Sequence, residues 1–525
     1  MKLEPVIGLE IHVQLKTKSK MFCGCDTNLE YAKPNSAICP ICMGQPGTLP
    51  VVNHTAINFA HRICLALNFK INKYTKFDRK NYFYPDLPKG YQISQYELPM
   101  GENGYLPMVI KGEEKKIAIE RIHLEEDTGK LIHPKDLDYS LVDYNRAGTP
   151  LCEIVTKPEI SSPAEAKKFM QELQLLMRYL EVSDAEMENG QMRCDGNISL
   201  RPIGEDKLYP KTEIKNLNSF KALEKALEYE IKRQTEIWER GAIPGRVVTK
   251  EIKLPLTYAI KGQKEIITDQ QETMGWDENK NQTVLQRVKE TLADYRYFPE
   301  PDIPPMEFSD ADLKRIEKSQ IPELPWQKRK RFRDQFGLVG DETEVLIQNE
   351  SLANYTENVI SELVSWLSST SEIEGTTEEI WERDGGKISK MALSWVVNRL
   401  KVALDNQGID LNNSKVGPEN MAELITLVYG SRINSTTAQK ILDIMVENGG
   451  DPSQIIEAGD LNQVSDKKDL STIIDQVIAK NPEQVKEYQA GKLPLLKYFV
   501  GQTMKLSKGK ADPQVIEELL IERLR

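Results

Sequence analysis

The stretch Leu9-Glu10-Ile11-His12-Val13-Gln14-Leu15 alternates apolar residues with Glu, His and Gln. Side chains of a strand point alternately to its two faces, so this pattern predicts a strand with one apolar and one polar face. On the polar face, Glu10 and His12 would project together, about 7 Å apart. The stretch therefore predicts a sheet that is anchored in a core on one side and carries ionisable groups on the other.

Three further segments repeat this alternation, and each carries charged residues on its polar face. The segments and their polar residues are 117–126 with Arg121, His123 and Glu125; 192–201 with Arg193, Asp195, Asn197, Ser199 and Arg201; and 211–215 with Lys211, Glu213 and Lys215. One such strand is an ordinary half-solvated strand. Four of them favour a single sheet with a charged, reactive face, although four unrelated solvated strands would give the same pattern.

The length and composition bound the class of protein. A chain of 525 residues predicts two to four domains, and 39% hydrophobic with 28% charged residues predicts a globular fold. A net charge of −11 argues against a nonspecific nucleic-acid coat but allows a local basic patch. No apolar run reaches the roughly 18 residues of a membrane span, and the first residues lack a signal-peptide core. The expected location is the cytoplasm, or an organelle matrix.

The pattern of elements divides the chain into three predicted domains. Residues 1–302 mix strands with two clear helices, which begin at Ser162 and Ser219, and this mixture predicts an α+β domain with a mainly antiparallel sheet and flanking helices. A proline cluster around 299–305 ends it. Residues 303–406 predict an all-helical domain, and residues 407–525 predict a tail domain of short amphipathic helices.

Four cysteines form two close pairs in a turn-rich segment, at Cys23, Cys25, Cys39 and Cys42. Four thiolates at this spacing can close a tetrahedral zinc site. Such a site leaves no position open for substrate, so its role would be structural. The alternative is four packed thiols in a reducing compartment.

Several acids and one histidine on the predicted strands provide ligands for a hard cation. Oxygen ligands with one imidazole suit Mg²⁺ better than catalytic zinc. The alternative is a set of surface salt bridges with Arg121, Lys211 and Lys215. The candidate ligands are Glu10, His12, Glu125, Glu126 and Glu213.

Residues 77–95 are dense in aromatic and basic side chains. Such a segment could bind phosphates and stack a base on Tyr82, Phe83, Tyr84 or Tyr91, although an aromatic-rich packed loop has the same composition. The sequence contains neither a P-loop nor a dinucleotide-type glycine motif, so any ATP site belongs to another fold. The candidate phosphate-binding residues are Arg79, Lys80, Asn81, Lys89, Asp195 and Lys215.

The segment 491–511 contains five lysines and no acid, within an acidic protein. A stretch of one sign with Gly, Tyr and Phe is typical of contacts to a phosphate backbone, and plain protein surface is the alternative. The candidate RNA-binding residues are Lys497, Lys505, Lys508 and Lys510.

Long motifs in a fixed order resemble the B subunit of the bacterial and organellar tRNA-dependent amidotransferases. The matching stretches are VIGLEIHVQL (6–15), FDRKNYFYPD (77–86), HLEED (123–127), NRAGTPL (145–151), RCDGNISLRP (193–202), EIKNLNSF (213–220), DYRYFPEPD (294–302), VGQTMK (500–505) and GKA (509–511). The resemblance spans essentially the whole chain. It implies a cradle-shaped catalytic domain, a helical domain and a helical tail that contacts tRNA.

The resemblance also implies a reaction on misacylated Glu-tRNA(Gln), Asp-tRNA(Asn) or both. The B subunit uses ATP and Mg²⁺ to phosphorylate the side-chain carboxylate of the aminoacyl group. Ammonia from a glutaminase A subunit then displaces the phosphate, and a small C subunit completes the assembly. The residues that match the implied catalytic positions are Glu10, His12, Glu125 and Glu213.

Two features set limits on the resemblance. The segment 247–274 looks longer than the usual connection in the family, and zinc cysteines occur in only some members. The chain has no Ser- and Gly-rich amidase signature, so it needs a partner for ammonia. A non-catalytic tRNA-binding scaffold with structural zinc is the main alternative. A zinc hydrolase using His12 and His123 is weaker, because the cysteines would close their own site.

Overall fold

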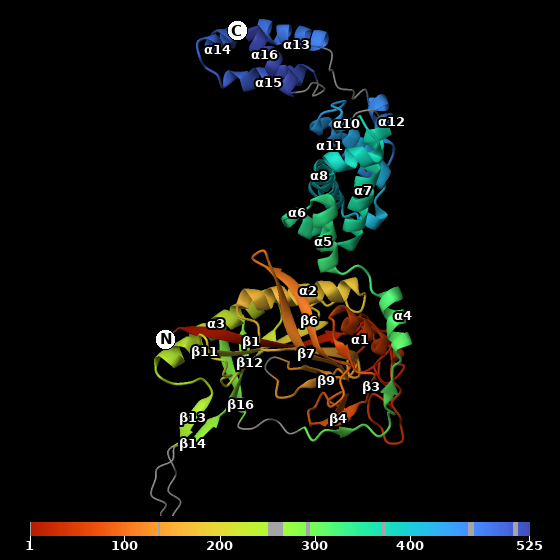
Figure 1. The fold of residues 1–525 in the computed structure, drawn as a ribbon, viewed down its shortest axis with the longest axis vertical. Helices are drawn as coiled ribbons and strands as arrows, with labels where there is room; N and C mark the ends of the chain where they lie inside the picture. Colours follow the sequence, from red (N-terminus) through yellow and green to blue (C-terminus); the bar gives the residue numbers. More distant parts are fainter. Residues whose placement is uncertain are drawn as a thin grey trace, which may run out of the picture. The chain divides into compact units, whose positions relative to one another are not determined.

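The computed structural model describes residues 2–134, 137–249, 266–289, 295–369, 374–459, 467–507 and 513–524. It forms two compact units, Met1–Trp326 and Gln327–Arg525, which are shown as ribbons in Figure 1. The division into three domains at residues 302 and 406 stays a prediction.

The first unit is built from strands with a few helices. The strands are β1 Leu3–Gln14, β2 Lys70–Ile71, β3 Tyr74–Thr75, β4 Asp78–Asn81, β5 Tyr91–Ser94, β6 Gly101–Ile110, β7 Glu113–Glu126, β8 Lys130–Ile132, β9 Leu141–Asp143, β10 Pro150–Thr156, β11 Met192–Pro202, β12 Thr212–Leu217, β13 Arg246–Thr249, β14 Ile266–Asp269, β15 Gln271–Asp277, β16 Gln282–Lys289, β17 Phe298–Pro299 and β18 Met306–Glu307. The helices are α1 His54–Ala66, α2 Pro163–Tyr179, α3 Phe220–Glu239 and α4 Asp310–Gln320.

One large sheet runs through this unit in the order β16-β15-β12-β11-β1-β10-β7-β5-β4-β17. Its neighbouring strands are antiparallel except for the parallel pair β12 and β15. The four strands with charged faces, β1, β7, β11 and β12, all belong to it, so the prediction of a single sheet is confirmed. Strand β10 lies between β1 and β7 in this sheet. The sequence of β10 does not alternate between polar and apolar residues, so the alternation pattern does not predict this strand.

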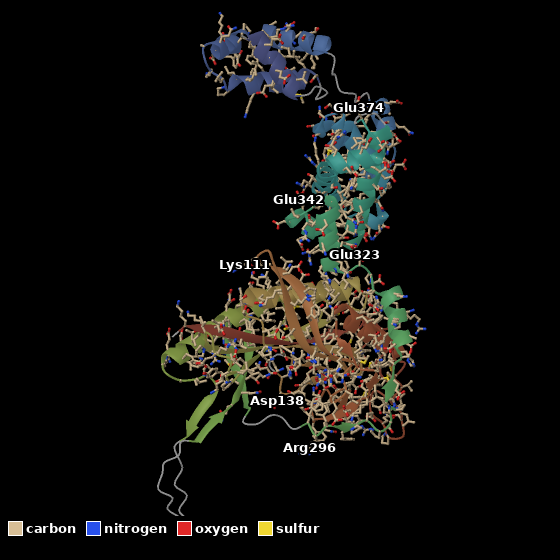
Figure 2. All side chains as sticks on the ribbon, in the orientation of Figure 1. Lys111, Asp138, Arg296, Glu323, Glu342 and Glu374 are labelled. Atoms are coloured by element: carbon tan, nitrogen blue, oxygen red, sulfur yellow. The ribbon has the colours of Figure 1, made fainter. Side chains whose placement is uncertain are left out.

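The apolar face of the sheet packs against helices. Leu9, Ile11 and Val13 are at most 1% exposed and share one core with residues of α1, α2 and α3. Figure 1 shows α2 and α3 lying along the sheet, and Figure 2 shows the β6–β7 hairpin ending at Lys111. Both predicted helix starts are present, because the side chains of Ser162 and Ser219 cap α2 and α3. The helices therefore leave the opposite, charged face free for a site.

The second unit is helical. Its elements are α5 Pro325–Phe336, α6 Asp341–Ile347, α7 Glu350–Ser369, α8 Thr377–Trp395, the π-helix Val396–Leu400, α9 Lys401–Gln407, the 3₁₀-helix Leu411–Asn413, α10 Pro418–Tyr429, α11 Ser435–Asn448, α12 Pro452–Gly459, α13 Lys467–Lys480, α14 Pro482–Gln489, α15 Leu495–Leu506 and α16 Pro513–Leu524. The fold class is therefore an α+β unit followed by helices, as predicted.

Contacts within the second unit join its helices. The hydroxyl of Tyr355 on α7 donates to the carbonyl of Val416 just before α10, over 3.0 Å. A separate cluster joins α13, α15 and α16 around Leu470, Phe499 and Leu520. Among the helices that the structure describes, none has the length and apolar composition needed to cross a bilayer.

Replacing Phe169 on α2 with alanine should destabilise the first unit by about 3–5 kcal/mol, because a fully buried ring is lost and leaves a cavity under the sheet. Hydrogen exchange of the β1 peptide in increasing urea would measure unfolding of this unit separately. The control Gln171→Ala, exposed on the same helix, should change stability by less than about 0.5 kcal/mol. Equal effects of the two variants would contradict the burial of Phe169 beneath the sheet.

Candidate active site

The register of the sheet places one row of ionisable residues across four neighbouring strands. His12 on β1 is the Cα partner of Arg193 on β11 and of Glu153 on β10, and Glu153 is in turn the partner of His123 on β7. Because direct partners on one face lie about 5 Å apart, the row brings these side chains together. We call the charged face around this row the floor.

Two histidines and two glutamates form the centre of the floor. His12 Nε2 lies 3.2 Å from Glu153 Oε2 and 3.5 Å from Glu125 Oε1. His123 Nε2 lies 3.4 Å from Glu153 Oε2 and 3.8 Å from Glu125 Oε2. The hydroxyl of Ser94 donates to Glu125 over 3.3 Å. Each glutamate therefore faces both imidazoles.

The glutamates favour the protonated form of both imidazoles. Burial lowers the pKa of His12, but hydrogen bonds and charges of Glu125 and Glu153 outweigh it and raise that pKa to about 10. The pKa of His123 is raised by the same two acids against the effect of burial. Burial raises the pKa of Glu125, but Lys80 and the histidines hold it well below its usual range. At neutral pH the centre of the floor is a set of ion pairs.

Lys80 on β4 lies near Glu125 and Glu153, and its ammonium faces the ring of a tyrosine. Its ammonium lies 5.2 Å from the centre of the Tyr295 ring. Burial lowers the pKa of Lys80, but Glu125, Tyr297 and Glu153 more than compensate and raise it. The segment that supplies these tyrosines is tied to β4, because Asn81 Nδ2 donates to the carbonyl of Arg296 over 2.8 Å. Figure 2 labels Arg296 at the edge of the unit.

A second group of charges lies on β1, β11 and β12. Lys215 Nζ lies 2.6 Å from Asp195 Oδ2 and 3.2 Å from Glu213 Oε1. The hydroxyl of Thr273 also donates to Glu213 over 2.9 Å. Burial and the charge of Glu153 raise the pKa of Glu10, which lies among these acids. Glu10 therefore gives up its proton less readily than Glu125 and Glu153, whose pKa values are lowered.

A cavity of about 900 Å³ opens above the floor. This volume falls within the range of small-molecule sites and suits a nucleotide. Its walls bring together most of the predicted site residues and add Asp127, Arg193 and Arg287. The predicted residues that line it are Glu10, His12, Lys80, Glu125, Asp195, Glu213 and Lys215.

Four predicted residues have side chains committed elsewhere. Arg79 forms a two-pronged ion pair with the buried Glu300, with distances of 2.7 and 2.9 Å. Asn81 holds the tyrosine segment, as described above. Lys89 pairs with Glu126, and Glu126 also accepts from the backbone N–H of Ile93 over 2.9 Å. Among the residues lining the large cavity, none of these four occurs.

Glu126 lies on the opposite face of β7 from Glu125, as strand alternation requires. It lines a small cavity of about 60 Å³ together with Lys89, Cys23 and Cys42. The structure therefore brings Glu125 to the floor and Glu126 to the cysteine cluster.

The four cysteines come together in the loops before α1. The Sγ atoms of Cys23, Cys25, Cys39 and Cys42 all lie within 4.8 Å of one another. Tetrahedral zinc with Zn–S bonds of about 2.3 Å needs sulfurs about 4 Å apart, so this geometry fits. The backbone N–H of Cys39 donates to Cys42 Sγ over 3.2 Å. The Cys23 thiol, which hydrogen-bonds to Cys42, lowers the pKa of Cys42 to about 4.

Sequence reasoning missed Glu153, which is shared by two groups that could hold a cation. The ligand atoms of Glu10, His12 and Glu153 lie within 4.8 Å of one another, and so do those of His123, Glu125 and Glu153. The detectable signal is one acid inside the apolar run 150–156. A strand that is buried on both faces does not alternate between polar and apolar residues, so a search for alternation does not find β10.

Arg193 is predicted only as a polar-face residue, although it lies at the floor. Its Nη2 donates to Asp127 Oδ1 over 2.9 Å, while its buried Nε has no acceptor among the described residues. Arg146 Nε approaches the same carboxylate at 3.3 Å. Arg193 lines the large cavity, where its guanidinium can meet a ligand.

Two of the four predicted RNA-binding lysines lie among the residues that the structure describes. Lys497 and Lys505 are exposed on α15, just over two turns apart. Lys508 and Lys510 lie outside the described residues, as does much of the segment 247–274. The described remainder of that segment contributes to β13, β14 and β15.

Comparisons with known proteins agree with the motifs. Residues 5–314 match the family model of the GatB/GatE catalytic domain, and residues 377–524 match that of the GatB domain. The chain belongs to the B-subunit family of tRNA amidotransferases. It is similar to the aspartyl/glutamyl-tRNA(Asn/Gln) amidotransferase B subunit of Carboxydothermus hydrogenoformans, with 42% identity over 99% of this chain and 98% of the relative. The proteins of the same name from Thermodesulfovibrio yellowstonii and Moorella thermoacetica are 42% and 41% identical, with complete coverage of both chains.

Replacing Glu153 with glutamine should lower the pKa of both His12 and His123, because they lose the acid they share. In magnesium-free buffer, NMR of ¹³C-labelled histidine rings would follow their titration; His12 should lose its proton well below the pH of about 10 expected for the unchanged protein. Glu159→Gln, an exposed acid beyond the same strand, is the control and should leave both titrations in place. Unaltered histidine titration in Glu153→Gln would show that Glu153 does not hold them.

Proposed function

We propose that this chain is the subunit that activates and amidates the aminoacyl group of misacylated Glu-tRNA(Gln), Asp-tRNA(Asn) or both, at the expense of ATP. The observation that supports this most is the buried, ion-paired floor beneath a nucleotide-sized cavity, in a chain of the B-subunit family. Its expected location is the cytoplasm or an organelle matrix.

The proposed reaction has two steps. The side-chain carboxylate of the aminoacyl group attacks the terminal phosphorus of ATP, which gives an acyl phosphate and ADP. Ammonia then attacks the acyl carbon, inorganic phosphate leaves with the electron pair of the broken C–O bond, and the nitrogen loses a proton. A carboxylate is a poor acyl donor, so the first step supplies the leaving group. Catalysis of phosphoryl transfer rests mainly on positioning and charge neutralisation.

The cations of the cavity are suited to hold phosphates. Lys80 and Lys215 line it, and Arg193 offers a planar fork from β11. Arg193 and Lys215 are paired with Asp127 and Asp195, so both are held in place before a ligand arrives, and the charges of Glu125 and Glu153 stabilise the ammonium of Lys80. The roles proposed for Arg79, Asn81 and Lys89 are therefore indirect, through the tyrosine segment and Glu126.

The acids of the floor are suited to hold Mg²⁺. The two groups that share Glu153 provide carboxylate oxygens and imidazole nitrogens, which is a donor set that binds hard divalent cations. A bound Mg²⁺ would supply positive charge to the phosphates. His12 carries a proton where a cation could bind, so cation binding would release that proton. Among the candidate ligands, Glu126 faces away, and Glu213 reaches the cavity from β12.

Ammonia and assembly require other chains. The sequence has no amidase signature, so we propose an amidase A subunit as the source of ammonia and a small C subunit as a further partner. Each of the relatives is named as a B subunit, which supports a complex of several chains.

We propose zinc as the ion of the cysteine cluster, in a structural role. Four sulfurs within 4.8 Å of one another fit a closed tetrahedral site. Bound zinc would hold the loops before α1 together, and its binding free energy would become folding free energy.

Activity tests this proposal against that of a non-catalytic tRNA-binding scaffold. The complex reconstituted with A and C subunits should consume ATP only when Glu-tRNA(Gln) or Asp-tRNA(Asn) is present. In Glu125→Gln this consumption should fall at least 100-fold, because Glu125 bonds both histidines and faces Lys80. Glu114→Gln, exposed at the far end of β7, is the control. Full ATP consumption in Glu125→Gln would remove the floor from the mechanism, and tRNA binding with no ATP consumption in the unchanged complex would favour the scaffold.

Replacing Lys497 and Lys505 together with alanine should weaken tRNA binding and make its salt dependence shallower. Each lost phosphate contact lowers the slope of log affinity against log salt concentration by roughly one. The control Lys390→Ala with Lys440→Ala removes the same charge from exposed positions on α8 and α11. Titration of labelled tRNA at several salt concentrations measures the affinity and its salt dependence for both variants. Equal slopes for the α15 variant and the control would show that α15 is ordinary surface.

A further inference from the structure

A lysine is buried beside the cysteine cluster. The side chain of Lys20 is 0% exposed. Its ammonium donates to the carbonyl of Ala37 over 2.8 Å and lies 3.8 Å from Cys42 Sγ. Taking an ammonium out of water is costly unless an anion compensates it, so Lys20 needs a negative partner.

Among the residues that the structure describes, no carboxylate forms an ion pair with Lys20 within 4.0 Å. Glu126 lines the same small cavity, but its carboxylate is bound by Lys89. The anionic atom that remains in reach of Lys20 is the sulfur of Cys42. The burial of this lysine therefore makes physical sense when the neighbouring sulfurs carry negative charge.

A bound metal extends this negative charge to all four sulfurs, because each of them binds it as a thiolate. Four thiolates around a divalent cation retain two net negative charges, in a setting where little water can screen them. One buried ammonium at hydrogen-bond distance from a ligand sulfur offsets half of this charge. This argument comes from the lysine and is independent of the spacing of the cysteines.

We propose that Lys20 is the built-in counter-charge of the cluster of Cys23, Cys25, Cys39 and Cys42, and that it sets how tightly the module retains its divalent ion. The proposal rests on the zinc site of the proposed function and goes beyond it, because it assigns a positioning residue that is not a ligand. The ammonium stabilises the charged, metal-loaded cluster more than the metal-free one.

The backbone around Lys20 is built to hold this arrangement. The N–H of Lys20 donates to the carbonyl of Cys25 over 2.9 Å, and the next N–H, of Met21, donates to that of Gly148 over 2.8 Å. Gly148 has a φ of +88°, and a Cβ there would lie 3.4 Å from Lys20 Cδ and 3.5 Å from Cys42 Cβ. The backbone at Gly148 therefore packs closely against both the aliphatic part of Lys20 and the side chain of Cys42.

Two substitutions separate charge from hydrogen bonding. Lys20→Met removes the charge and the donor, whereas Lys20→Gln keeps a donor for the Ala37 carbonyl and removes the charge. The control Lys18→Met changes an exposed lysine of the same loop. The full-length chains would compete with a chromophoric chelator for Zn²⁺. We expect both Lys20 variants to bind Zn²⁺ about tenfold to a hundredfold more weakly than the unchanged chain, because a charge-assisted contact is lost. Lys18→Met should match the unchanged chain.

Cobalt(II) and thermal unfolding provide readouts that a purely structural lysine would not move. Cobalt bound to Lys20→Gln should keep the absorption of a tetrahedral four-sulfur site while binding more weakly. The loss of melting temperature on substitution should be larger in metal-loaded than in metal-free protein. Equal zinc affinity in Lys20→Gln and the unchanged chain, or equal thermal losses in the two states, would overturn the role of Lys20. An unchanged chain that binds no zinc would overturn the metal site itself, and the role of Lys20 with it.

Discussion

The pairing register of β1 with β10 and β11 is the constraint on which the site depends. It places His12 directly beside Glu153 on one side and Arg193 on the other. Side chains alternate with a period of two, so a slip of one residue would turn every floor side chain into the core and bring Leu9, Ile11 and Val13 to the surface. Because those three residues are completely enclosed between sheet and helices, the hydrophobic core itself enforces the register. The geometry of the ionisable groups is therefore fixed by packing on the opposite face.

Charge balance determines what the floor can accept. Six carboxylates and four Lys or Arg side chains line the large cavity, besides His12. A polyphosphate alone would meet a wall that is rich in acids, so its approach is favoured when a divalent cation accompanies it. Protonated His12 offsets part of the excess acid in the protein alone. A cation that replaces its proton would preserve the balance. Under the proposed function, this balance gives a physical reason for the many glutamates and aspartates in a site for an anionic substrate.

The sequence is sufficient to identify a strand that has one solvent-exposed polar face. It is insufficient for a strand that is buried on both faces. Alternation identifies β1, β7, β11 and β12 and so most of the floor. It cannot identify β10, because apolar residues fill both of its faces and hide Glu153 among them. Nor can composition separate Lys80, which reaches the cavity, from the neighbouring Arg79, whose side chain pairs with Glu300 more than 200 positions away. Partners so distant along the chain have no local signal.

The end of β7 links the two parts of the N-terminal unit that carry chemistry. Glu125 and Glu126 are consecutive, and alternation sends the first to the floor and the second to the small cavity beside Cys23 and Cys42. Glu126 is held there by Lys89, and both side chains are almost completely buried, so neither can leave without stranding the charge of the other. A shift of the cysteine loops would therefore be passed to Glu125 through a single peptide unit. The cysteine cluster can therefore affect the position of a floor carboxylate even in the purely structural role proposed for it.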